Sequence, residues 1–89
     1  MKECYLEVTF RHGRPLAGYY YLPRRAGQKS CRCRELGPGL IVDFTRSGRP
    51  IGIEIIDPAH VTVAAMNRVL RQLRQPALRR KDLAPLNAA

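Results

Sequence analysis

The 89-residue chain lacks tryptophan, has only seven acidic residues and contains no long apolar run. A helix that crosses a membrane needs about 20 consecutive apolar residues, so the chain is not expected to span a bilayer. The start, Met1–Cys4, lacks the apolar core of a secretion signal, which predicts a cytoplasmic protein. A compact domain usually needs on the order of a hundred residues, and the length therefore predicts one domain.

Cysteine is also scarce. Cys4, Cys31 and Cys33 cannot all pair within one chain, and without a secretion signal we expect free thiols. A metal held by the Cys-x-Cys pair would need two further ligands, and the candidates Cys4, His12 and His60 stand at no recognised zinc spacing. Residues two apart on a strand share a face, so Cys31 and Cys33 are expected to pack in the core. Metal or redox chemistry is the less favoured alternative, and no cofactor is expected.

Basic residues are in excess. Sixteen lysines and arginines against seven acidic residues give a formal net charge of +9. The hydrophobic content of 45% is ordinary for a folded domain and argues against disorder. A small domain with this charge attracts polyanions, such as nucleic acid or an acidic protein surface.

Two hairpins are predicted in the first part of the chain. In the first hairpin, residues 4–10 alternate between apolar and polar side chains, as a half-buried strand does. His12–Arg14 contains a glycine suited to a turn, and a return strand over Leu16–Leu22 follows. A two-residue loop would bring three residues of the return strand to the apolar face of the first strand: Ala17, Tyr19 and Tyr21.

The second hairpin is the clearest structural signal. A two-residue turn at Ser47–Gly48 brings three apolar pairs onto one face: Phe44 with Ile51, Val42 with Ile53, and Leu40 with Ile55. A shift of one residue would put these side chains on opposite faces, so the apolar pattern and the turn residues agree. A further short strand over Cys31–Leu36, ended by Gly37–Gly39, would complete a sheet of four or five strands.

One helix is predicted after the sheet. Asp57 and Pro58 suit the cap and the first position of a helix, which would run to about Arg74 and end before Pro76. Apolar residues at spacings of three and four form a stripe that would cover the sheet: Val63, Met66, Val69, Leu70 and Leu73.

The predicted fold is therefore α+β, with a small antiparallel sheet of four to five strands packed on one C-terminal helix. Residues 1–75 are expected to form this single domain. Residues 76–89 form a basic tail that is expected to be flexible or to dock on a partner.

A resemblance to a known family rests on the second hairpin. Leu40–Phe44 (LIVDF) followed by Gly48–Asp57 (GRPIGIEIID) is similar to the hallmark hairpin of a small prokaryotic family, the domain of unknown function 2283. The similarity covers residues 39–59 and implies the same hairpin fold. Family members carry acidic turn residues where this chain has Thr45–Ser47. The family has no agreed activity, and the occurrence of some members beside toxin-type genes implies at most an antitoxin or accessory binding role.

Catalysis has little support in the sequence. Asp43 and Glu54 are predicted to lie near each other on the outward side of the second hairpin, where paired carboxylates could do acid–base chemistry. We expect them instead to balance nearby arginines on a solvated face. Neither His12 nor His60 stands at a recognisable catalytic spacing from Ser or Cys, and the glycines form no phosphate-binding loop. The protein is therefore predicted not to be an enzyme.

The arginines are the candidate contacts for nucleic acid or an acidic partner. They fall in predicted loops, on the helix and in the tail: Arg24, Arg25, Arg46, Arg49, Arg68, Arg71, Arg74, Arg79 and Arg80. Tyr5 and Tyr20, expected on the outward face of the sheet, could add base stacking. No recognised nucleic-acid motif is present.

The outward face of the sheet is also a candidate protein interface. Alternation places Tyr20, Ile41, Ile56 and Leu22 on the side that the helix does not cover, where a back-to-back or edge-to-edge homodimer would bury them. Alternatively, the tail folds over this face with three leucines: Leu78, Leu83 and Leu86. The leading prediction is a small non-enzymatic protein-interaction module that forms homo-oligomers or binds a protein partner. A nucleic-acid-binding module is the alternative.

Overall fold

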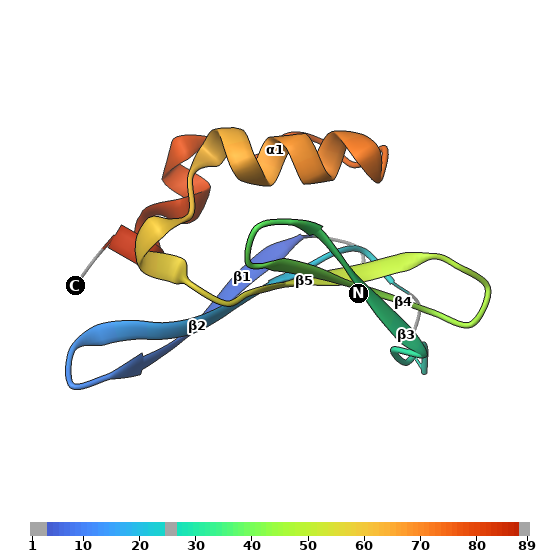
Figure 1. Ribbon diagram of the computed structural model, residues 1–89, viewed down its shortest axis with the longest axis horizontal. Helices are drawn as coiled ribbons and strands as arrows, with labels where there is room; N and C mark the ends of the chain where they lie inside the picture. Colours follow the sequence, from blue (N-terminus) through green and yellow to red (C-terminus); the bar gives the residue numbers. More distant parts are fainter. Residues whose placement is uncertain (1–3, 25–26, 88–89) are drawn as a thin grey trace.

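The computed structural model describes residues 4–24 and 27–87, with side chains through residue 84. Five antiparallel strands form one sheet: β1 (Tyr5–Arg11), β2 (Arg14–Tyr21), β3 (Arg32–Gly37), β4 (Leu40–Phe44) and β5 (Pro50–Ile55). Their order across the sheet is β1-β2-β5-β4-β3. One α-helix, α1 (Val63–Gln72), lies across one face (Figure 1). The predicted α+β fold is confirmed.

Two short 3-10 helices flank α1. They are η1 (Pro58–His60) before it and η2 (Arg80–Asn87) after it. Among the helices of the described residues, none is long and apolar enough to pass through a bilayer.

The β4–β5 hairpin confirms two of the three predicted pairs, Leu40 with Ile55 and Val42 with Ile53. The third prediction is wrong, because a bulge shifts the register and Phe44 lies opposite Pro50. The connection is a wider loop than two residues. Thr45 closes it, since its backbone N–H donates to the Arg49 carbonyl at 2.8 Å and its hydroxyl accepts from the Arg49 N–H at 3.1 Å.

In the β1–β2 hairpin, the tyrosines of β2 lie on the opposite faces of the sheet from those predicted. His12 and Gly13, with φ angles of 53° and 76°, form the expected two-residue turn, but the register shifts after Thr9. The bulge leaves one residue of β2 unpaired, so the faces of β2 exchange. Tyr20 pairs with Leu6 and is only 7% exposed.

The exchange moves two predicted interface residues into the core. Tyr20 and Leu22 pack beneath the helix, whereas Tyr19 and Tyr21 point to the open face with Tyr5. Pro15, which lies beside the bulge, is the residue type that could have indicated it, because proline occurs in sheets mainly at edges and bulges.

The helix begins later than predicted. Thr62 caps α1, because its hydroxyl accepts a hydrogen bond from the Ala65 N–H at 3.0 Å. Asp57 makes no cap and instead contacts His60 Nδ1 at 2.9 Å. At the other end, Arg74 adopts a left-handed conformation with φ of 58°, and the Gln75 N–H donates to the Leu70 carbonyl. This closes the helix in the Schellman arrangement.

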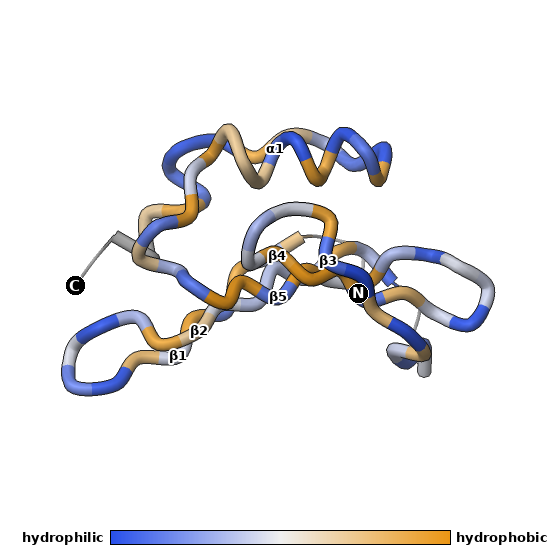
Figure 2. Tube along the Cα trace, viewed as in Figure 1, coloured by the Kyte–Doolittle hydropathy of each residue, from blue (hydrophilic) through white to orange (hydrophobic). Residues whose placement is uncertain are grey.

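All of the core lies between the sheet and the helices. The predicted helical stripe is confirmed, with three residues buried and Val63 and Leu73 packed against the core. Hydrophobic residues are concentrated along the central strands β4 and β5 (Figure 2). The buried core residues are Tyr20, Leu22, Leu40, Val42, Ile53, Ile55, Met66, Val69, Leu70, Leu78 and Leu83.

The tail belongs to this core, unlike the flexible or partner-docked segment predicted from the sequence. Leu78 and Leu83 are 4% and 2% exposed, on the same side of the sheet as α1. The Asn67 side chain clamps the tail, since its Oδ1 accepts from the Leu78 N–H at 2.8 Å and its Nδ2 donates to the Leu78 carbonyl at 3.2 Å. The tail therefore does not cover the open face with these leucines. The side chain of Leu86 lies outside the described residues.

Candidate functional site: a tyrosine face and an arginine side

The open face of the sheet carries three of the four tyrosines, and we call it the tyrosine face. Two rows of side chains cross it at right angles to the strands. From β1 to β3, the first row is Tyr5, Tyr21, Gly52, Asp43 and Cys33. The second row is Glu7, Tyr19, Glu54, Ile41 and Glu35. Four of the seven carboxylates of the chain are thus on this one face.

Aromatic contacts hold one half of the tyrosine face together. The rings of Tyr5 and Tyr21 are stacked, with centroids 4.4 Å apart and planes within 15°. Tyr19 meets Tyr21 edge-on at 4.7 Å. The guanidinium carbon of Arg24 lies over the Tyr21 ring, 5.3 Å from its centroid, in cation–π geometry. The face therefore already holds one arginine side chain of its own chain.

Tyr19 crosses from β2 to β4 above Gly52. Its hydroxyl donates to Asp43 Oδ2 at 2.7 Å, and a Cβ on Gly52 would overlap the ring. Burial raises the pKa of Tyr19, and the hydrogen bond to Asp43 and the charge of that carboxylate raise it further. Burial and the charge of Glu7 also raise the pKa of Tyr21. Both tyrosines are therefore neutral donors near neutral pH.

The two carboxylates considered for acid–base chemistry do lie on this face, as predicted. Asp43 stands opposite Gly52, and Glu54 stands opposite both Tyr19 and Ile41. Asp43 accepts the hydrogen bond from the Tyr19 hydroxyl. Glu54 is exposed and makes no hydrogen bond or ion pair with any described residue. Glu54 is thus a free anion at the centre of the face.

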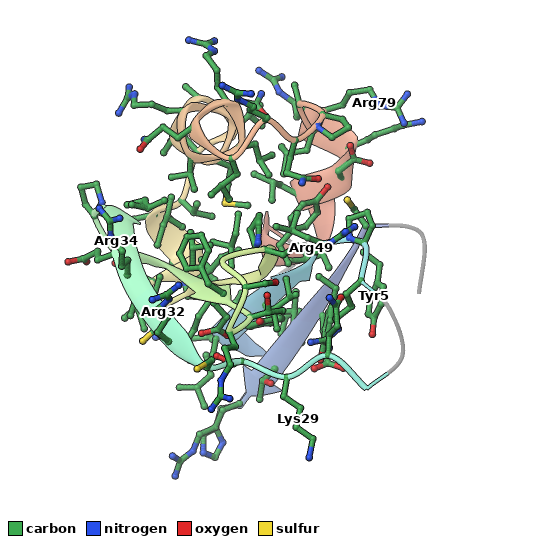
Figure 3. All side chains as sticks on the ribbon, turned by 90° about the vertical axis from the view of Figure 1, so that its right-hand side faces the viewer. Tyr5, Lys29, Arg32, Arg34, Arg49 and Arg79 are labelled. Atoms are coloured by element: carbon green, nitrogen blue, oxygen red, sulfur yellow. The ribbon has the colours of Figure 1, made fainter. Side chains whose placement is uncertain are left out.

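The opposite side of the molecule is basic, and we call it the arginine side. It comprises the exposed cations of α1, of the segment that follows and of the helix-facing side of β3: Arg68, Arg71, Arg74, Arg80, Lys81, Arg32 and Arg34. Figure 3 shows Arg32 and Arg34 on β3 at one edge of the sheet, Tyr5 at the other, and Arg79 at the level of the helices.

This side has few carboxylates: Asp57 lines a hollow together with Arg68, and Asp82 pairs with Arg79. Between Pro58 and Lys81 the sequence has six cations and no acidic residue. Within residues 4–24 and 27–84, the ion pairs closer than 4 Å are His60–Asp57 and Arg79–Asp82. The cations of the arginine side are therefore not neutralised by a described carboxylate.

The structure brings some of the predicted arginines together and separates others. Arg68, Arg71, Arg74 and Arg80 share the arginine side, whereas Arg24 lies on the tyrosine face. Arg46 and Arg49 are exposed in the loop of the β4–β5 hairpin. Arg79 pairs with Asp82 at 3.7 Å, and Arg25 lies outside the described residues.

Sequence reasoning missed Arg32 and Arg34. They pair with Phe44 and Val42, so they face the helix side of the sheet. The Arg32 guanidinium reaches the hairpin loop, 3.9 Å from the position of a Cβ on Gly48. The alternation of the Cys31–Leu36 segment could have placed both arginines on one face, opposite to the cysteines.

A shallow hollow of about 430 Å³ lies beside α1. Its lining is mostly apolar, with Arg68, Asp57 and His60 at the polar positions. The Asp57–His60 pair is largely exposed, and no cysteine or serine lines the hollow. The arginine that lines it, Arg68, is one of the cations already assigned to the arginine side.

The cysteines do not pack in the core as predicted. Cys33 is exposed because β3 presents it on the face away from the helices, Cys31 is exposed just before β3, and Cys4 is partly buried against the core. No group of three or more potential metal ligands occurs in the part of the chain that the structure describes.

The structure does not bring the predicted interface residues together on one surface. Ile41 lies on the tyrosine face between Glu54 and Glu35, and Ile56 is 51% exposed just beyond β5. Tyr20 is in the core and cannot contribute to an interface.

Comparison with protein-family models, with curated proteins and with solved structures found no match. The resemblance of residues 39–59 to the domain of unknown function 2283 therefore stays a prediction.

Proposed function

We propose that the protein binds nucleic acid through its arginine side. The observation that carries the proposal is the separation of charge, with four carboxylates on the tyrosine face and unneutralised cations on the helix side. Phosphate contacts with Arg and Lys supply most of the sequence-independent affinity for nucleic acid, through release of counterions. A surface on which cations outnumber carboxylates suits this, because the protein then repels the phosphates only weakly.

A duplex fits this side better than a single strand. Proteins that bind single strands stack bases on exposed aromatic rings. The three outward tyrosines lie on the opposite face, and Phe44, next to Arg32, is partly buried against the core. Binding through phosphates alone requires no base contact and is insensitive to sequence.

Self-association is the second candidate function. A back-to-back homodimer of the tyrosine face would bring like charges together, because each copy presents Glu7, Glu54 and Asp43 there. Like charges placed opposite each other are destabilising. The structure therefore favours an edge-to-edge dimer through β1, which has Glu7 and Arg11 as its charged residues.

The test is fluorescence anisotropy of a labelled DNA duplex of about 20 base pairs titrated with the protein at several salt concentrations. For duplex DNA, each neutralised phosphate contributes about −0.9 to the slope of log K against log salt. Replacing Arg68 and Arg71 by glutamine should weaken binding and reduce that slope by about 2.

The matched control replaces Arg11 and Arg14 by glutamine. This removes the same charge from the exposed turn of the β1–β2 hairpin, away from α1 (Figure 1). An equal loss of affinity in both variants would show that only net charge matters and would contradict the arginine side as the site. No binding of the native protein at low salt would exclude nucleic acid and leave an acidic protein as the ligand of this side.

A further inference from the structure

The tyrosine face has a different chemistry from the arginine side, and we infer that it docks a proline-containing, arginine-bearing segment of a partner protein. The segment would lie across the strands in the extended polyproline II conformation. This surface is independent of nucleic-acid binding, since it is on the opposite side of the sheet from α1.

The first argument is the arginine that the face already holds. Arg24 sits over the Tyr21 ring at 5.3 Å, and that ring is itself stacked on Tyr5. Stacked, neutral tyrosines present the negative faces of their rings to a guanidinium. Tyr5 remains 46% exposed. Its ring therefore offers aromatic surface beside the Tyr21 ring, which Arg24 covers.

The second argument is the spacing of the anions in the second row. Glu7, Glu54 and Glu35 stand on alternate strands β1, β5 and β3. Neighbouring strands are about 4.8 Å apart, so these positions repeat at about 9.6 Å. A polyproline II helix has three residues per turn and rises about 9.3 Å per turn. Cations at every third residue of such a segment therefore match the row.

The third argument is what lies between the glutamates. Tyr19 separates Glu7 from Glu54, and Ile41 separates Glu54 from Glu35. Proline-rich segments in this conformation dock on surfaces lined with aromatic rings. Glutamates that can bind cations thus alternate with apolar side chains along the row. Arginines and prolines would alternate in the same way along the docked segment.

The test uses a seven-residue peptide with arginine at its first, fourth and seventh positions and proline–serine pairs between them. The peptide is titrated into uniformly ¹⁵N-labelled protein, and amide chemical shifts report both the affinity and the location. We expect shifts on all five strands, from β1 to β3, and none on the outer surface of α1. A control peptide of the same composition, with its three arginines adjacent, should bind several-fold more weakly.

The matched protein variants are Glu54→Gln and Asp57→Asn. Both remove one exposed negative charge, but Asp57 lies in the segment after β5 and not on the tyrosine face. Removal of one exposed ion pair should weaken binding of the peptide to Glu54→Gln by about 1.4- to fivefold. Asp57→Asn should leave the affinity unchanged.

Three results would overturn the inference. Equal binding of the two peptides would mean non-specific attraction of cations. Equal binding of arginine amide alone would mean a site for a small cation and not for a segment. A dimer in sedimentation equilibrium, together with amide shifts on the tyrosine face that depend on protein concentration and are not reversed by the peptide, would make self-association its function.

Discussion

Tyr19 lies directly over Gly52, and this places its hydroxyl 2.7 Å from Asp43 on the far side of β5. The glycine leaves the room that the ring needs to cross a whole strand. One contact thereby ties β2, β5 and β4 together on the open face, where no helix packs.

Substitution of Gly52 by alanine should therefore be destabilising. The new Cβ would overlap the Tyr19 ring, and forcing such a group into a packed site costs about 1–3 kcal/mol. The free energy of unfolding from chemical denaturation measures the loss. In a Tyr19→Ala background the same Gly52→Ala change should cost much less, and equal costs in both backgrounds would contradict the close approach.

Arg74→Gly should raise stability. Arg74 has φ of 58° at the end of α1, a conformation that costs an L-residue roughly 1–2 kcal/mol and glycine very little. We expect a net gain of about 1 kcal/mol in thermal or chemical unfolding. Arg71→Gly removes the same charge from inside the helix and should cost about 1 kcal/mol instead. Destabilisation by both changes would rule out the left-handed cap.

Leu83→Ala should show that the tail is part of the core. Leu83 is 2% exposed, and truncation of a buried leucine to alanine costs about 2–5 kcal/mol. Leu16 is 53% exposed, so Leu16→Ala should change the free energy of unfolding by less than about 0.5 kcal/mol. A tail that is flexible in solution would make the two substitutions equally mild.

Alkaline pH should unfold the protein through its tyrosines. Burial raises the pKa of Tyr19, Tyr20 and Tyr21 above the ordinary value of about 10, helped by Asp43, Cys4 and Glu7 respectively. The folded state then holds protons that the unfolded state has released. The stability is fully present below about pH 10 and falls as the pH rises beyond it.

Phenolate absorbance and unfolding, followed together against pH, measure this effect. Tyr19→Phe removes one of the raised groups, so stability should fall less steeply with pH in that variant. Phenolate appearing in all four tyrosines before any unfolding would contradict the raised pKa values.

The two hairpins show how far the sequence predicts this fold. In β4 and β5, aliphatic residues on one face make any other register costly, and Leu40–Ile55 and Val42–Ile53 are paired as predicted. In β2, tyrosines occupy positions 19, 20 and 21 in succession, so either face could be the buried one. The single bulge after Thr9 determines which face of β2 is buried.

The candidate site, like the fold, could be predicted from the sequence only in part. The arginines of α1 follow from helical spacing, since Arg68 and Arg71 stand away from the buried stripe. The tyrosine face could not be predicted, because it depends on the bulge and on the pairing of β2 with β5, more than 30 residues apart. The clamp of Asn67 on Leu78 likewise comes from tertiary packing.

The clamp between Asn67 and the tail has a consequence for biosynthesis. The sheet cannot be completed until β5 has left the ribosome, because β5 joins its two halves. Even then the hydrophobic core beneath α1 is complete only when Leu78 and Leu83 have been added. The nascent chain therefore exposes aliphatic surface until Leu78 and Leu83 have been synthesised, and termination before these residues would yield a species prone to aggregate and to be degraded.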